Sequence, residues 1–131
     1  ILSGLSAHAT SEFADAKYVL QISDNDPSKQ DLVLNVASNL LKHHGQDQVA
    51  VEIVAFGPGL RLMFAANSSA PRIGSLSSSG VAFSACGNTL AKMTTLRDGE
   101  APAINPAAEV VPAGAVRIGE LVSQGYTLIK P

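Results

Sequence analysis

The sequence predicts a single three-layer α/β domain, in which helices cover both faces of a mainly parallel five-stranded sheet. Short apolar runs typical of strands alternate along the chain with amphipathic helical segments, and the connections between them are short. The 131 residues suffice for one domain and are too few for two. With 46% hydrophobic and 15% charged residues the chain can bury a core, which argues against global disorder.

Five short runs predict the strands. The first, at residues 18–22, is bounded by the turn-rich segment Ser23-Asp24-Asn25-Asp26. The second, at residues 49–55, is almost continuously apolar, as is typical of a parallel strand that is covered on both faces. The five predicted strands are residues 18–22, 49–55, 81–85, 109–111 and 126–129.

The first helix has clear start and stop signals. Asp26 can cap its free N–H groups, Pro27 fits its first turn, and Gly45 is expected to end it after His43 and His44. Two apolar stripes are expected to face one core: Leu32, Val36 and Leu40, and Val33, Ala37 and Leu41.

Four further helices complete the alternation with the strands. They are predicted at residues 60–66, at residues 71–79, after Cys86 (apolar positions Leu90, Met93 and Leu96), and after Gly114 (apolar positions Ile118, Leu121 and Val122). Residues 97–108 hold two prolines and a glycine and are predicted to form a loop.

Composition excludes several classes of function. A formal net charge of −2 argues against nucleic-acid binding, and the apolar stretches fall short of the ~20 residues of a membrane span. A single cysteine forms no internal disulfide and no dithiol exchange pair. No cofactor is predicted, because Gly57-Pro58-Gly59 lacks the rest of a phosphate loop and only 5% of residues are aromatic, which disfavours a stacked flavin.

The first residues favour two interpretations. Ala7-His8-Ala9 after an apolar stretch resembles the end of a secretory signal, which would place the protein outside the cytoplasm. The alternative is an ordinary leader on a cytoplasmic protein. Either way we expect residues 1–16 to be a leader or signal-peptide remnant and residues 17–131 to be the domain.

The turns at the carboxyl ends of the strands hold the candidate site, because ligands of parallel sheets bind there. Cys86 lies where a strand ends and a helix begins, a position whose free N–H groups favour a thiolate. Gly87, Asn88 and Thr89 could donate to an anion beside the sulfur. The alternative is that Cys86 is a small buried hydrophobic residue. The other residues expected around this crevice are Asp24, Asn25, Gly57, Gly59, Arg61, Pro112, Gly114 and Arg117.

Several of these residues have ordinary structural explanations. Arg61 and Arg117 could each bind an anion or form a salt bridge. Asp24 and Asp26 lack the later glycine and glutamate of a calcium loop, so helix capping is expected there and no metal site is predicted.

Four segments together resemble the DsrE/DsrF-like family of small α/β proteins, which are tied to intracellular sulfur oxidation and sulfur relay. The resemblance covers about residues 17–131 and is most specific around Cys86. It implies the DsrEFH-like variant of the flavodoxin-like fold and homo-oligomers such as trimers or hexamers. The segments are Leu20-Gln21-Ile22-Ser23-Asp24, Val51-Glu52-Ile53-Val54-Ala55-Phe56-Gly57-Pro58-Gly59, Phe83-Ser84-Ala85-Cys86-Gly87-Asn88-Thr89 and Val110-Val111-Pro112-Ala113-Gly114.

The resemblance also implies a role for the cysteine. In sulfur-relay members a cysteine after a central strand carries sulfur as a persulfide, and Cys86 matches that position. We therefore expect a single-cysteine sulfur carrier that takes sulfur from a donor protein or polysulfide and passes it to an acceptor thiol. The alternative is a non-catalytic ligand-binding or assembly protein in which Cys86 is structural, so whether the protein is an enzyme stays open.

Overall fold

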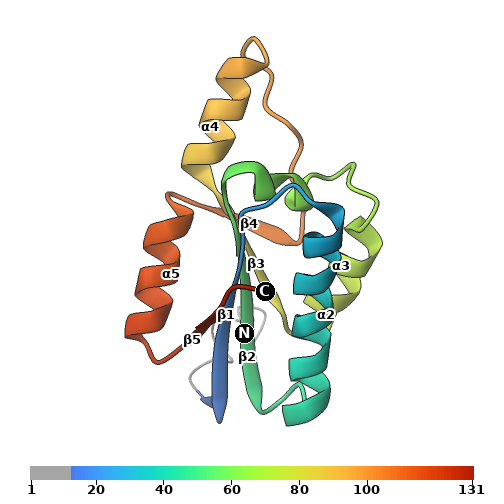
Figure 1. Ribbon diagram of the computed structural model, residues 1–131, viewed down its shortest axis with the longest axis vertical. Helices are drawn as coiled ribbons and strands as arrows, with labels where there is room; N and C mark the ends of the chain where they lie inside the picture. Colours follow the sequence, from blue (N-terminus) through green and yellow to red (C-terminus); the bar gives the residue numbers. More distant parts are fainter. Residues whose placement is uncertain (1–12) are drawn as a thin grey trace, which may run out of the picture.

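The computed structural model describes residues 13–131 and has the predicted fold class: a five-stranded, all-parallel sheet with helices on both faces (Figure 1). The predicted leader lies outside the described residues except for its last four, and Ala7-His8-Ala9 lies outside them entirely. The elements are β1 (Ala16–Ile22), α2 (Pro27–His44), β2 (Val49–Ala55), the 3-10 helix η3 (Gly57–Met63), α3 (Ala70–Ser78), β3 (Ala82–Cys86), α4 (Gly87–Leu96), β4 (Ala108–Val111), α5 (Gly114–Ser123) and β5 (Thr127–Ile129).

The strand order is β4-β3-β2-β1-β5. The chain advances one strand at a time from β1 to β4 and then returns across the sheet to place β5 beside β1. The return is made by α5, which contacts β1, β2 and β3 on the face opposite α2 and α3 (Figure 1). The helices that follow the neighbouring strands β3 and β4 therefore leave the sheet in different directions (Figure 1).

Two cores lie on the two faces of the sheet. All seven residues of β2 are buried, as predicted, and its apolar residues alternate between the two cores. The larger core, under α2 and α3, includes Val51, Ile53, Ala55, Leu60, Leu62, Ile73 and Phe83. The smaller core, under α5, consists of Val19, Ala50, Val54, Ile118, Leu121 and Tyr126, with Ala14 and Phe56 packed against it.

The ends of α2 lie where the sequence predicts them, but one residue predicted to face the core does not. Asp26 Oδ1 accepts a hydrogen bond from the Ser28 N–H at 2.9 Å, and Gly45 ends the helix at φ +87°. The prediction for Leu32 is wrong, because its side chain is 43% exposed. The buried side of α2 is centred near Val33 and Ala37, and at 100° per residue Leu32 lies on the opposite side of the helix.

The segment after β2 also differs from its prediction. A 3-10 helix over Gly57–Met63 replaces the helix predicted at residues 60–66. The chain turns at once after β2, with Gly57 at φ +57°, and Gly59 packs against the backbone of Ile22 and Ser23. No Cβ fits at Gly59, so this tight turn depends on glycine.

The helix α4 projects beyond the carboxyl ends of the strands (Figure 1). None of its residues is buried; Leu90 and Met93 are partly buried, and Leu96 is 75% exposed. The expectation that Leu96 faces the core is therefore wrong. Val122, near the end of α5, is exposed as well. Within residues 13–131 no helix is both long and apolar enough to cross a membrane.

Candidate functional site

Three of the predicted turns meet at the carboxyl end of the sheet. Cys86 ends β3 and pairs in register with Val111 of β4, so the turns after these strands are neighbours. The Asn88 N–H donates to Pro112 O at 3.2 Å, which joins these two turns. The Gly57 N–H donates to Thr89 Oγ1 at 2.9 Å, which joins the turn after β2 to them.

Cys86 lies at the centre of this arrangement and is buried, with 6% of its surface exposed. It is the N-cap of α4, and the Thr89 N–H donates to Cys86 Sγ at 3.5 Å. The first residue of α5, Gly114, packs directly beside it. A Cβ on Gly114 would lie 3.3 Å from Cys86 Cβ and 3.0 Å from Phe56 Cβ. Glycine thus lets the N-terminus of α5 pack directly against Cys86.

These contacts favour the thiolate of Cys86. Burial raises the pKa of the thiol. The donors around the sulfur, at Thr89, Gly114 and Asn88, lower it by more, so the pKa lies below its usual value. Of the donors expected from the sequence, Thr89 and Asn88 act on the sulfur, and Gly114 adds one from a second helix N-terminus. Gly87 packs against the backbone of Val111 and Pro112.

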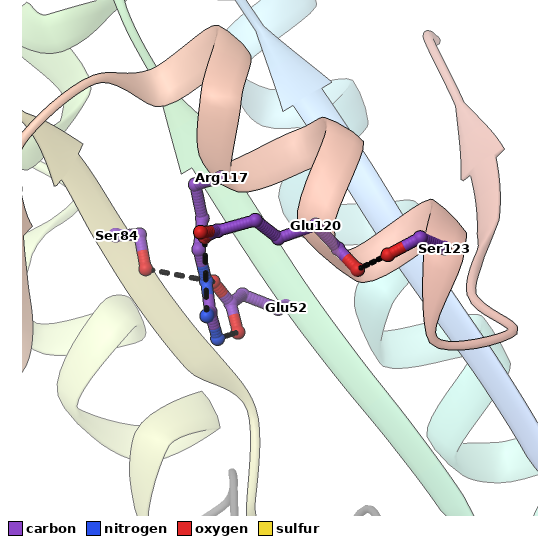
Figure 2. A network of polar contacts seen from close by, with 5 residues as sticks. All are labelled: Glu52, Ser84, Arg117, Glu120 and Ser123. Atoms are coloured by element: carbon purple, nitrogen blue, oxygen red, sulfur yellow. Dashed lines mark hydrogen bonds and ion pairs between the residues drawn. The ribbon is translucent and has the colours of Figure 1, made fainter.

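Arg117 forms the salt bridge that was one of its two expected roles. Its Nε and Nη2 atoms each lie 2.8 Å from a carboxylate oxygen of Glu52, and Ser84 Oγ donates to Glu52 Oε2 at 2.8 Å (Figure 2). The hydrogen bond with Glu52 raises the pKa of the Arg117 guanidinium. Sequence reasoning missed Glu52 and Ser84, although a lone glutamate in the apolar run of residues 49–55 was a detectable signal.

Within the described part of the chain, the remaining predicted residues form no hydrogen bond or ion pair with the Cys86 site. Asp24 pairs with Lys29 (Oδ2–Nζ 3.2 Å), and Asn25 is exposed in the same loop. Arg61 is exposed and lines a shallow cavity of about 360 Å³ together with Phe64, Met93, Leu96 and Arg97. Among the described residues, no hydrogen bond or ion pair joins Asp24, Asn25 or Arg61 to the Cys86 site.

The described residues offer no cluster of metal ligands. Within residues 13–131, no three His, Cys, Asp or Glu side chains come together in a way that could hold an ion. Every buried side-chain nitrogen or oxygen in this part of the chain has a hydrogen-bond partner.

No protein-family model matches the chain, and no curated protein matches it significantly. Among solved structures it is similar to a protein of unknown function, MTH1491, from Methanobacterium thermoautotrophicum. The two share 25% sequence identity with a TM-score of 0.79, over 89% of this chain and 100% of the other. The similarity supports the fold and assigns no activity.

Proposed function

We propose that this protein is a sulfur carrier, which accepts sulfur as a persulfide on Cys86 and passes it to the thiol of a partner. The observation that carries the proposal is the position of Cys86: it caps the N-terminus of α4, where the Thr89 N–H donates to Sγ at 3.5 Å, and it lies directly beside Gly114 at the N-terminus of α5. The donors around the sulfur lower the pKa of the thiol. A thiolate is the nucleophile in sulfur exchange, so this environment favours the reaction. The resemblance of the segments around Cys86 to the DsrE/DsrF-like family supports the same chemistry.

The proposed exchange has two balanced steps. First, the Cys86 thiolate attacks the outer sulfur of a donor persulfide; a bond forms to Sγ, the donor S–S bond breaks, and the donor leaves as a thiolate. Second, an acceptor thiolate attacks the outer sulfur of the Cys86 persulfide, and the Cys86 thiolate is restored. Neither step needs an oxidant or reductant. The single cysteine of the chain suffices, because the acceptor brings its own.

Burial of Cys86 restricts the size of the sulfur donor that can reach the thiol. With 6% of the residue exposed, the proposal requires a slender reactant, such as inorganic polysulfide or the tip of a persulfide side chain. The donors around Sγ are then available to the outer sulfur of the persulfide, whose negative charge they stabilise.

The proposal is tested by intact-protein mass spectrometry after incubation with inorganic polysulfide. We expect wild-type protein to gain the mass of one or more sulfur atoms and to lose it on reduction. Cys86→Ser should gain none, because it has no thiol. Iodoacetamide treatment of the folded protein measures access to the same sulfur independently.

The result that contradicts the carrier proposal is the absence of sulfur gain by wild type, combined with no alkylation of the folded protein. Cys86 would then be a packing residue. That outcome favours the second candidate function, a non-catalytic subunit that assembles with copies or partners. The projecting helix α4, with no buried residue and an exposed Leu96 at its end, is the observation that favours this candidate.

A further inference from the structure

A polar cluster lies on the same face of the sheet as α5, close along the chain to the Cys86 site. Glu52 of β2 accepts three hydrogen bonds of 2.8 Å, from Ser84 Oγ of β3 and from Nε and Nη2 of Arg117. Figure 2 shows the Arg117 side chain reaching from α5 to Glu52 on the sheet. One carboxylate thus ties two neighbouring strands to the helix that crosses them. We call this cluster the Glu52–Arg117 clamp.

Stability alone is a weak explanation for the clamp. Glu52 is 1% exposed and is the one charged residue among the buried residues of 13–131. Taking two charges out of water carries a large penalty, and well-packed apolar side chains of similar volume often serve stability as well or better. A bidentate guanidinium–carboxylate pair does something that apolar packing does not, because it fixes the direction of both side chains.

The clamp is connected to Cys86 along both the strand and the helix. Ser84 precedes Cys86 by two residues, so both side chains lie on the same side of β3. Gly114 precedes Arg117 by three residues, about one helical turn. The Arg117 N–H donates to Ala113 O at 3.0 Å, so the residue held by Glu52 also closes the first turn of α5. Displacing Arg117 would therefore displace Gly114.

We propose that Arg117, held by Glu52, is a positioning residue for Cys86, because the clamp fixes the first turn of α5, where Gly114 packs directly beside Cys86. This inference rests on the proposed function, since it concerns how the reactive thiolate is stabilised. It goes beyond that function by naming residues that do not touch the sulfur.

A direct electrostatic effect of the clamp on Cys86 is a different mechanism. The pKa of the thiol is shifted by burial and by the donors at Thr89, Gly114 and Asn88. Neither Glu52 nor Arg117 is among the causes of this shift. Around Arg117 itself, the other charged or titratable groups that act are Glu120 and Tyr126. The two mechanisms predict opposite signs for Glu52→Gln. Loss of a negative charge would lower the thiol pKa, whereas loss of the Gly114 hydrogen bond raises it.

The test is a thiolate titration of Glu52→Gln by ultraviolet absorbance. The chain has one cysteine, so the thiolate signal belongs to Cys86, and Cys86→Ser supplies the tyrosinate background. We expect the midpoint to rise by about one pH unit, which leaves about tenfold less thiolate at a pH below it. Thermal unfolding measured on the same sample shows whether the variant is folded.

Three further variants complete the design. Glu120→Gln is the matched control, because Glu120 is 56% exposed and only 4.0 Å from Arg117 Nη1; its midpoint should equal that of wild type. Arg117→Lys keeps the charge and loses the bidentate geometry, so its midpoint should lie between those of wild type and Glu52→Gln. Glu52→Gln/Arg117→Met removes both charges, so it stands in for Glu52→Gln if the single variant does not fold.

An unchanged or lowered midpoint in folded Glu52→Gln, or in the folded double variant, overturns the positioning role. If Glu52→Gln and the double variant both unfold, an unchanged midpoint in Arg117→Lys overturns the positioning role. Failure of the wild type to take up sulfur, combined with no alkylation of the folded protein, overturns the proposed function instead. That failure leaves the thiolate midpoints measurable, so the two failures are distinguishable.

Discussion

Gly114 is the residue whose size decides how closely α5 approaches Cys86. A methyl group there would lie 3.0 Å from Phe56 Cβ and 3.3 Å from Cys86 Cβ. We expect Gly114→Ala to lower the free energy of unfolding by about 1–3 kcal/mol, because the helix start must move away from the strand. The same movement withdraws the N-terminus of α5 from Cys86. Chemical denaturation measures the first effect, and the rate of alkylation of the folded protein measures the second.

Gly119 provides the control in the same helix. It is exposed and adopts no positive φ, and a methyl group added to it would have no neighbour within 4 Å. Gly119→Ala should raise the free energy of unfolding by about 0.5–1 kcal/mol, because alanine has the higher helix propensity. If the two substitutions have equal effects on stability and alkylation, the close approach at Gly114 has no special importance.

Among single residues, those at turns were easier to predict than those that act through pairs. Cys86, Gly57 and Gly114 could be placed at the carboxyl end of the sheet, because turn residues and strand ends are local features of the sequence. The pairing of Glu52 with Arg117 could not, because 65 residues separate them and only the crossing of α5 over β2 brings them together.

At the scale of elements, α5 depends on few contacts for its position. Among the described helices it is the one that covers its face of the sheet, over a core of six buried residues (Figure 1). The Glu52–Arg117 clamp adds a directional contact to this small apolar surface. The position of α5 matters for function in our proposal because its N-terminus completes the surroundings of Cys86.

The helices also show what hydrophobic patterns predict poorly. The bounds of α2 were predictable from its caps, whereas the outward direction of Leu32 was not, since one apolar stripe can be drawn on more than one side of a helix. The apolar spacing of Leu90, Met93 and Leu96 correctly indicated a helix at α4. It could not reveal that α4 projects past the sheet, where no element of the described chain covers Leu96.

For the whole molecule, the exposed Leu96 of α4 makes self-association the property to measure. The homo-oligomer that the family resemblance implies predicts a mass in light scattering that is a multiple of the 13.5 kDa of one chain. Leu96→Glu should shift this mass toward that of a single chain, because a charge at an apolar interface is unfavourable.

The matched control for this prediction is Leu32→Glu, a similar change at an exposed leucine on α2. It should leave the mass unchanged. A wild-type mass of 13.5 kDa would contradict the proposal of a homo-oligomer.

The fold class of the whole molecule could be predicted, but the strand order could not. Alternation of strands and helices predicts a parallel sheet, since short connections leave few alternatives. Nothing in residues 126–129 indicates that the last strand lies beside β1 at the far edge. That placement sends α5 back across the sheet and so creates the contacts between α5, Cys86 and Glu52.

The most direct test of the account is the pH dependence of iodoacetamide alkylation of the folded wild-type protein, followed by intact mass. The rate depends on the thiolate, so it falls as the pH drops below the pKa of Cys86. We predict that the folded protein reacts and that the midpoint lies below the ~8.5 of a free cysteine thiol, because the donors at Thr89 and Gly114 outweigh burial. A folded protein that does not react at all, or that reacts with a midpoint at or above the ~8.5 of a free cysteine thiol, would contradict the claim that Cys86 is a stabilised, reactive thiolate.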